Sequence, residues 1–315
     1  MATLTRSILG VGKAALSQAA ALIQTMRPKQ WTKNGFIFVP LIFDGKLPLP
    51  INDRLSNTPY FLLTAAGFAL LCLSSSAIYV INDLVDIEAD RAHPIKRDRP
   101  LPSGRLSRGV AIAAAIALPA VSLLLAFLLD GAFAAVLAGY LALQIAYSFW
   151  LKHIALLDVL TIAAGFLLRV AAGVVLVDVQ RFSPWLYIFT AMLALFLGFA
   201  KRRQELVLLQ EGANNHRAIF DHYNVKLLDE IILITTATTV MTYALYTFSA
   251  EGLPENHAMM LTTPFVLYGI FRYLYLIHVR GEGDAPDEVI LRDRPMQAAV
   301  LLWGLAVILI LYVLA

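Results

Sequence analysis

The fold is decided by a stretch at residues 59–90, which reads PYFLLTAAGFALLCLSSSAIYVINDLVDIEAD. Its first part, residues 59–81, is almost entirely apolar or small, and as a helix it is long enough to cross the hydrocarbon core of a bilayer. An acidic run follows at once, at Asn82, Asp83, Asp86 and Asp90. The stretch therefore predicts a membrane-spanning helix that brings several carboxylates to the membrane surface.

The spacing of the acidic run is typical of one helical face. Asn82, Asp86 and Asp90 are four residues apart, and Asp83 precedes Asp86 by three, so a continuous helix places them together. Carboxylate oxygens suit hard cations, and Mg²⁺ typically joins one or two carboxylates to substrate phosphates. A solvated helix end is the alternative, but a cationic run follows at Arg91, His93, Lys96, Arg97 and Arg99. The combination favours a metal–diphosphate site, with Asp83, Asp86 and Asp90 as catalytic and metal-binding residues.

The composition predicts a polytopic membrane protein. Hydrophobic residues make up 59% of the chain and charged residues 15%, against about 25% charged in a soluble domain. The single cysteine, Cys72, lies in an apolar segment, which excludes a disulfide framework and a thiolate metal site. We expect membrane lipids as surroundings and no nucleic-acid partner, and the sequence leaves the oligomeric state open.

Apolar segments predict about nine transmembrane helices, an all-α fold around a central cavity. Eight are long enough by themselves, and a ninth, at 34–43, spans only with part of its flanking sequence. The eight lie at 59–81, 109–129, 131–150, 154–177, 184–200, 227–249, 258–279 and 295–315. We expect one membrane domain over residues 1–315, in which residues 1–33 form a cytoplasmic or interfacial N-terminal segment.

The lysines and arginines set the expected orientation. With the N-terminus in the cytoplasm, the inner segments hold twenty of the 25 basic residues, and the outer loops hold only Lys46, Arg54 and Arg181. This is a strong positive-inside bias. It predicts a multi-pass protein of the plasma membrane whose acidic run faces the cytoplasm, where soluble phosphorylated metabolites are found.

Two further motifs could bind phosphate. The stretch from Arg27 to Asn34 holds three cations and a tryptophan just before the first span, which suits either an interfacial anchor or phosphate binding. Between two later spans, Tyr147 and Lys152, followed by Asp158, could orient a phosphate, or could be a belt aromatic and a snorkelling lysine.

The span that begins at residue 184 ends in Lys201-Arg202-Arg203-Gln204-Glu205. Lys201 and Arg202 lie four and three residues before Glu205, which gives a mixed-charge helical face. Such pairs often serve only solvation, but opposite the acidic run they would clamp phosphate. Arg169 and Arg272 fall inside spans, where ionisable groups are rare. For Arg169, an internal ion pair and a substrate contact are equally favoured.

With these motifs in view, the chain resembles the UbiA superfamily of intramembrane prenyltransferases, and within it the decaprenyl-phosphate phosphoribosyltransferase branch. The superfamily pattern Asn-Asp-x-x-Asp-x-x-x-Asp matches Asn82 to Asp90. The resemblance to the branch covers nearly the whole chain and includes the stretches at 27–34, 88–100, 201–206 and 291–294.

One departure from ordinary members of the superfamily matters. Members that join a prenyl diphosphate to an aromatic acceptor carry a second aspartate-rich motif where this chain has Lys201 to Glu205. A basic segment there suits a donor with more phosphate charge, as the resemblance implies. That donor is 5-phosphoribosyl 1-diphosphate, and the acceptor is a polyprenyl (decaprenyl) phosphate, in the synthesis of cell-wall arabinan precursors.

The resemblance implies a glycosyltransferase that uses Mg²⁺ and releases pyrophosphate. Lys96, Arg97, Lys201 and Arg202 would then clamp phosphates, and Asn82 would bond the donor or orient a carboxylate. The expected contacts of the acceptor are Arg27, Lys29, Lys33, Tyr147 and Lys152. Asn34 and Glu205 complete the predicted substrate-binding set.

Two alternatives remain at this point. An ordinary UbiA-type enzyme would move a prenyl group from its diphosphate to an aromatic or other small acceptor, although the basic segment at Lys201 argues against it. A transporter of anionic metabolites would also carry charges at helix ends. Transporters typically build their sites near the bilayer midplane, whereas here charge concentrates at one face.

Overall fold

The computed structural model describes residues 16–50, 54–179, 182–210, 218–281, 289 and 292–314. These residues form helices joined by short connections, and no strand occurs among them. The start of the predicted interfacial segment, residues 1–15, lies outside the described residues. The rest of that segment consists of a helix at 16–26, Arg27 and the start of η1 (Pro28–Phe38).

Eight helical segments in the described residues are long and apolar enough to span a membrane. They confirm the all-α, multi-pass fold, with boundaries that agree with the predicted spans mostly to within a few residues. The helices are α3 (Thr58–Val85), α5 (Arg108–Leu129), α6 (Gly131–Phe149), α7 (Leu157–Val177), α8 (Pro184–Gln210), α9 (Val225–Ser249), α10 (Thr263–His278) with the short η6 (Ala258–Thr262) before it, and α12 (Arg294–Tyr312).

The short ninth segment is a helix of unusual pitch. It consists of η1 (Pro28–Phe38), which is a 3₁₀ helix, and α2 (Val39–Phe43). A 3₁₀ helix rises about 2.0 Å per residue and an α-helix about 1.5 Å. The segment is therefore roughly 30 Å long, close to the thickness of the hydrocarbon core. In the described residues, however, this segment is not among the helices that are long and apolar enough to span a membrane.

Two glycines allow this segment to pack between α3 and α7. A Cβ atom at Gly173 of α7 would lie 2.1 Å from the carbonyl oxygen of Ile37, and one at Gly67 of α3 would lie 3.0 Å from the Ile37 Cδ1 atom. A larger residue at Gly173 would collide with the backbone of the segment and push it away, whereas one at Gly67 would meet only side-chain ends. Ile37 is fully buried as a result, and the segment is part of the core.

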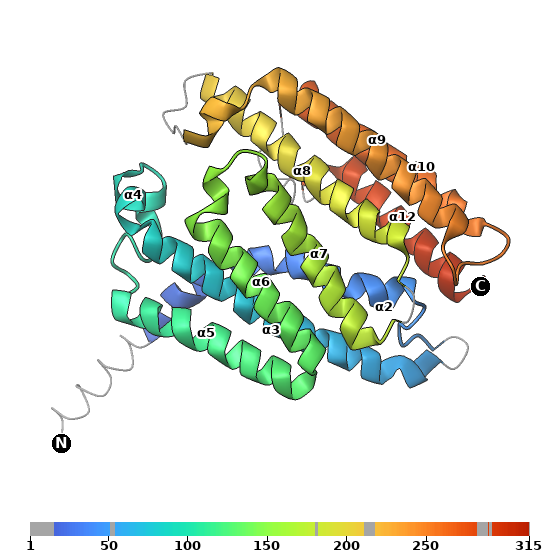
Figure 1. Ribbon diagram of the computed structural model, residues 1–315, viewed down its shortest axis with the longest axis horizontal. Helices are drawn as coiled ribbons and strands as arrows, with labels where there is room; N and C mark the ends of the chain where they lie inside the picture. The colour runs from blue at the N-terminus through green and yellow to red at the C-terminus, as the bar shows by residue number, and fades with distance from the viewer. Residues whose placement is uncertain are drawn as a thin grey trace.

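The helices form two halves that meet where α7 packs on α8. In Figure 1, α3, α5, α6 and α7 lie side by side, and α8, α9, α10 and α12 make up the other half. The polar connections after α3, α6 and α8 lie at one end of the bundle, at the upper left of Figure 1. We call this the charged end. Its connections include α4 (Ile87–Ala92), η4 (Leu151–His153) and η5 (Ala218–His222).

The acidic run differs from the predicted single helix. Helix α3 ends at Val85, Asp86 has non-helical backbone angles (φ −91°, ψ 7°), and α4 starts at Ile87. Hydrogen bonds still cross the break, from the Asp86 amide to the Asn82 carbonyl and from the Asp90 amide to the Asp86 carbonyl. The kink therefore changes which side chains share a face without cutting the chain of hydrogen bonds.

Candidate active site

Two carboxylates of the acidic run are buried and share one arginine. The side chains of Asp83 and Asp90 are only 3% and 4% exposed. The same nitrogen of Arg99 donates to Asp90 Oδ2 at 2.6 Å and to Asp83 Oδ1 at 3.4 Å. The kink between α3 and α4 thus turns these two side chains toward each other across one guanidinium.

Two more cations come from different parts of the chain. Arg27, between the N-terminal helix and η1, donates to Asp83 Oδ1 at 2.7 Å and stacks on the Tyr79 ring at 4.8 Å. Lys96 Nζ lies 3.7 Å from Asp90 Oδ1. We call these five residues the Asp83–Asp90 cluster. Its carboxylates are buried, whereas Arg27, Arg99 and Lys96 are 32–34% exposed.

The third carboxylate, Asp86, faces another element. Its side chain is 45% exposed and lies 3.7 Å from Lys152 Nζ on η4. The acidic run therefore contacts Lys152, another of the predicted site residues, but through Asp86 alone. The acidic run is thus divided between a buried pair and a more exposed member.

A second buried cluster lies where α7, α8 and η5 meet. Arg202 Nε donates to Asp158 Oδ2 at 2.6 Å, and another nitrogen of Arg202 donates to Glu205. The Tyr223 hydroxyl donates to Asp158 Oδ1 at 2.8 Å and accepts from the Leu156 amide at 2.6 Å. Burial raises the pKa of Tyr223, so this phenol stays protonated. We call Arg202, Asp158, Glu205 and Tyr223 the Arg202 cluster.

The Arg202 cluster is more enclosed than the Asp83–Asp90 cluster. The side chains of Arg202 and Asp158 are 6% and 0% exposed. Lys201, one residue earlier, is 45% exposed and lies 4.0 Å from Glu205. The phenol of Tyr147 is close enough to Arg202 to interact with it electrostatically, so the predicted residues on α6 and α8 come together.

The remaining predicted residues lie at different depths. Lys29 and Arg97 are exposed, and Lys33 and Asn82 are half-buried. Asn34 is fully buried, and its amide nitrogen donates to Ser75 Oγ at 3.1 Å and to Cys72 Sγ at 3.3 Å.

The Asn34 carbonyl in turn binds the intramembrane arginine of α7. Arg169 Nε donates to Asn34 Oδ1 at 2.8 Å, and its other nitrogens donate to the Tyr140 hydroxyl and the Gly165 carbonyl. Within the described residues these partners are all neutral. Arg169 therefore takes part in a hydrogen-bond network and not in the internal ion pair that was one of its two expected roles. The network joins the segment Pro28–Phe43 to α3, α6 and α7.

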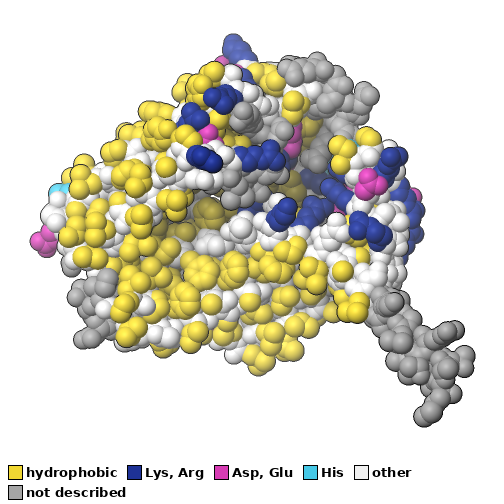
Figure 2. Space-filling view, turned by 180° about the vertical axis from the view of Figure 1, so that it is seen from behind, with side chains coloured by type: hydrophobic (Ala, Val, Ile, Leu, Met, Phe, Trp, Pro, Cys, Tyr) yellow, Lys and Arg dark blue, Asp and Glu magenta, His cyan; other side chains and the backbone are white. Residues whose placement is uncertain are grey.

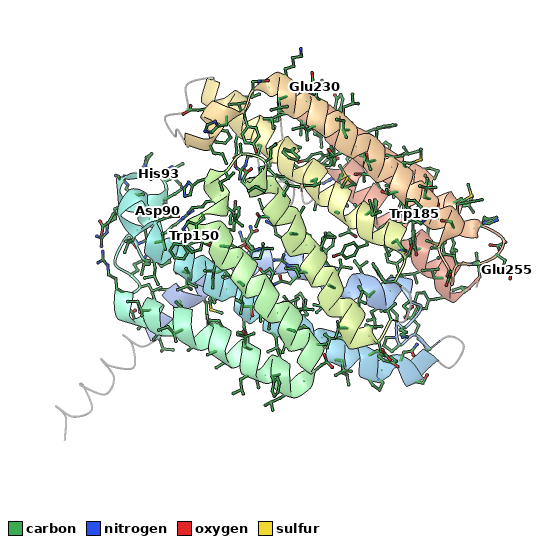
Figure 3. The ribbon with its side chains drawn as sticks, in the orientation of Figure 1. Asp90, His93, Trp150, Trp185, Glu230 and Glu255 are labelled. Atoms are coloured by element: carbon green, nitrogen blue, oxygen red, sulfur yellow. The ribbon has the colours of Figure 1, made fainter. Side chains whose placement is uncertain are left out.

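The surface of the molecule reflects this distribution of charge. Figure 2 shows lysine and arginine side chains gathered around a hollow, next to a broad hydrophobic face. In Figure 3, Asp90, His93 and Trp150 lie at the charged end, and Trp185 and Glu255 lie toward the opposite end. A hydrophobic surface with a basic, hollowed end suits a membrane protein that binds an anion at one face.

Comparison with known proteins identifies the family. The profile of the UbiA prenyltransferase family matches residues 52–289. The chain belongs to the UbiA prenyltransferase family. A decaprenyl-phosphate phosphoribosyltransferase of Corynebacterium glutamicum is 34% identical over 303 residues, which cover 94% of this chain and 88% of that protein. One of Mycolicibacterium smegmatis is 32% identical over 293 residues, covering 90% of each.

Solved structures of UbiA proteins share the fold. A UbiA homologue from Archaeoglobus fulgidus, bound to DMAPP and Mg²⁺, superimposes with a TM-score of 0.68 and 18% sequence identity. The match covers 93% of this chain and 99% of that one. At this identity the likeness establishes the architecture of the UbiA fold and leaves the substrate open.

The residues of the Asp83–Asp90 cluster fit a magnesium ion by their chemistry. No three histidine, cysteine, aspartate or glutamate side chains converge as a ready cluster in the part of the chain that the structure describes. Magnesium, however, usually takes one or two carboxylates and completes its shell with water and substrate phosphate. Asp83 and Asp90 supply two such carboxylates, and Arg99 lies between them.

Three residues of the two clusters lay outside the predicted set of site residues. Arg99 appeared only as one cation in a basic run, and nothing in its spacing from Asp83 set it apart. Asp158 was named beside Tyr147 and Lys152 as a group that could orient a phosphate but was left out of the set, and Tyr223 had no sequence signal. The one available hint was the charge of Asp158 at the start of an apolar span, where an unpaired carboxylate would be costly.

Proposed function

We propose that this protein transfers 5-phosphoribose from 5-phosphoribosyl 1-diphosphate to a polyprenyl phosphate and releases pyrophosphate. The observation that carries the proposal is the excess of cations at the charged end. Arg27, Lys96 and Arg99 surround two carboxylates and keep a solvent-exposed side. Lys201 adds another exposed cation at the end of α8. The near full-length likeness to decaprenyl-phosphate phosphoribosyltransferases supports the same donor and acceptor.

The charge balance suits this donor. Phosphoribosyl diphosphate carries a 5-phosphate in addition to its diphosphate, so it brings more negative charge than a prenyl diphosphate. One guanidinium group can donate two parallel hydrogen bonds to two oxygens of a phosphate, and a lysine binds phosphate as a point charge. A cluster with more cations than carboxylates can therefore hold the donor and still neutralise Asp83 and Asp90.

The proposed reaction requires little proton transfer by protein side chains. An oxygen of the acceptor phosphate attacks C1 of the ribose, the bond from C1 to the diphosphate oxygen breaks, and pyrophosphate leaves with the bond electrons. The attacking group is already an anion at neutral pH, so no strong general base is needed. Mg²⁺, when held by Asp83 and Asp90, would neutralise charge on the leaving diphosphate.

The protein residues would orient the reactants and stabilise developing charge. Arg99 and Lys96 are the proposed donor contacts, because they lie at the buried carboxylates and remain accessible. Lys201, Arg97 and Asn82 are further donor candidates at the same end. We propose acceptor contacts for residues of the N-terminal motif and of the connection around η4, namely Arg27, Lys29, Lys33, Tyr147 and Lys152.

The geometry favours positioning roles for the more enclosed members of the predicted set. The side chain of Arg202 is only 6% exposed and donates to two carboxylates, so we propose that it fixes Asp158 and Glu205 and that Lys201 makes the phosphate contact. Asn34 is fully buried, and we propose that it anchors the segment that follows Arg27.

We place the charged end in the cytoplasm, because twenty of the 25 basic residues fall on that side. The background cysteine, Cys72, is buried, which allows a direct test in the plasma membrane of intact cells. An impermeant thiol reagent should label Glu255→Cys and leave Ile95→Cys, which is 78% exposed at the charged end, unlabelled. The reverse pattern would contradict the orientation. The charge distribution also predicts that the loop with Asp287 faces the cytoplasm, and this residue lies outside the described residues.

The transfer itself is tested with purified protein in detergent. Radiolabelled phosphoribosyl diphosphate is offered with Mg²⁺ and polyprenyl phosphates of several lengths, and the lipid fraction is counted. A labelled lipid, formed together with pyrophosphate and abolished by a chelator, is the expected result. Labelled lipid formed equally well with chelator present would contradict the role of magnesium. Pyrophosphate release without any labelled lipid would contradict the acceptor.

A further inference from the structure

We propose that His93 is a positioning residue that sets the donor-binding turn by capping it with a neutral ring nitrogen. The inference rests on the proposed function. His93 Nδ1 accepts hydrogen bonds from the backbone amides of Ile95, at 3.1 Å, and of Lys96, at 3.2 Å. This is the arrangement of a helix N-cap, in which one side chain satisfies the first free amides of a helical turn.

The turn that His93 caps carries the cations of the Asp83–Asp90 cluster. It continues with hydrogen bonds from the Arg97 amide to the His93 carbonyl and from the Arg99 amide to the Lys96 carbonyl. The side chains of Lys96 and Arg99 then reach back to Asp90. The position of both cations therefore depends on the backbone path from His93 to Arg99.

Apolar packing does little to hold the first part of this turn. None of the residues of η3 (Lys96–Asp98) is buried, and Ile95 is 78% exposed. Apolar packing begins only after Arg99, with Leu101 at 1% exposed. Hydrogen bonds are thus the main local restraint on the turn, and the cap at His93 provides two of them.

A histidine is an uncommon choice for a cap, and its charge explains the choice. Serine, threonine, aspartate and asparagine are the usual N-cap residues. Nδ1 can accept a hydrogen bond only when it carries no proton, so the capping ring presents a neutral acceptor there. An aspartate would cap the turn as well, but it would add a negative charge beside cations that must bind a polyphosphate. We infer that the position requires a capping group without negative charge.

Three substitutions separate capping from charge. His93→Ala removes the acceptor, His93→Asn keeps a neutral acceptor, and His93→Asp keeps an acceptor but adds a negative charge. The control is His153→Ala, which removes an exposed histidine from η4 at the same end. Donor KM, acceptor KM and kcat are measured for each variant, together with the affinity for pyrophosphate in the presence of Mg²⁺ by calorimetry and the melting temperature.

For His93→Ala, we expect a donor KM about 2- to 30-fold higher, which corresponds to the typical loss of an N-cap. The acceptor KM should stay within about twofold of the wild-type value, because the turn does not contact the acceptor. His93→Asn should restore donor KM, whereas His93→Asp should not, although its melting temperature matches that of His93→Asn. Magnesium pyrophosphate affinity should follow the same order, and His153→Ala should behave as the wild type.

Several outcomes would overturn the inference. One is that His93→Asp and His93→Asn have the same donor KM. Another is that the acceptor KM of His93→Ala rises as much as its donor KM. A third is that His93→Ala has the donor KM of the wild type. A wild-type protein that uses no phosphoribosyl diphosphate would contradict the proposed function instead. In that case the pyrophosphate affinities of the variants still decide whether His93 sets a phosphate-binding turn.

Discussion

The two ion clusters at the charged end differ in their balance of charge and in their exposure. In the Asp83–Asp90 cluster, three partly exposed cations surround two buried carboxylates. In the Arg202 cluster, one buried guanidinium is matched by two carboxylates, one of them fully buried. Cations in excess with an open side can bind another anion. A guanidinium that is buried among its carboxylate partners has little exposed surface left for phosphate.

This difference separates binding from positioning. Breaking a buried ion pair by removing one partner costs about 3–5 kcal/mol, because the other charge stays buried without a partner. Exposed cations contribute far less to stability, so they can change partners when a substrate arrives. We therefore expect changes in the Arg202 cluster to affect folding and changes among the cations of the Asp83–Asp90 cluster to affect donor affinity.

The largest expected effect on stability is that of Arg202→Ala. The change leaves Asp158 buried without its cation, so the free energy of unfolding should fall by about 3–5 kcal/mol. Thermal unfolding in detergent measures the loss, and the neighbouring, more exposed Lys201→Ala is the matched control. If Arg202→Ala melts with the wild type and instead loses only donor affinity, Arg202 is a phosphate clamp and the comparison fails.

The largest expected effect on activity is that of Asp83→Asn and Asp90→Asn. Both changes keep the shape of the side chain and remove the charge that would hold magnesium, so kcat/KM should fall roughly 10²- to 10³-fold, as for other lost electrostatic groups. Glu88→Gln, a change to an exposed carboxylate between them in sequence, should leave activity intact. Wild-type rates in the aspartate variants would remove the acidic run from the mechanism.

A smaller effect is expected for Arg99→Ala. The lost charge-assisted hydrogen bond is worth about 1.5–3 kcal/mol, which is about ten- to more than a hundredfold in donor affinity. The acceptor affinity and the melting temperature should change little. Arg108→Ala removes an exposed arginine that pairs with Glu88 and provides the control. Equal losses for donor and acceptor would show that Arg99 serves the fold rather than the donor.

The smallest effect is expected for an ion pair of intermediate burial, Arg272 with Asp293. Arg272 donates to both carboxylate oxygens of Asp293, at 3.2 and 2.8 Å, and this bond lowers the pKa of Asp293. The stabilisation is therefore complete above the ordinary carboxyl pKa of about 3.9 and is lost as the pH falls through the lower, folded value. Asp293→Asn should lower the melting temperature at pH 7 by less than Arg202→Ala does. At strongly acid pH, the difference from the wild type should vanish; a difference that persists there would show that the charge of Asp293 is not the cause.

The helices were predictable because their signal is local. Each long apolar run identifies its own span, and the predicted 59–81 compares with the observed Thr58–Val85. The segment Pro28–Phe43 was harder, because an apolar count does not reveal that most of it is a 3₁₀ helix. The break at Asp86 was missed for a similar reason, since a favourable spacing of acidic residues does not fix the backbone angles of one of them.

The pairing within the site was only partly predictable. The positive-inside pattern predicted that Arg27, Lys96 and Lys152 lie at the same membrane face as the acidic run. It could not select Arg99 from five neighbouring basic residues, since that depends on the turn after His93. Nor could it pair Arg202 with Asp158, 44 residues away, because only the packing of α8 on α7 brings them together.

The central claim is that the donor is a phosphoribosyl diphosphate. The most direct measurement is pyrophosphate release by the purified wild-type protein with Mg²⁺, in parallel assays with two donor–acceptor pairs. One pair is phosphoribosyl diphosphate with polyprenyl phosphate, and the other is a prenyl diphosphate with an aromatic acid. We predict acceptor-dependent release from the first pair only. Release from the second pair with none from the first would contradict the account and make the protein an ordinary prenyltransferase.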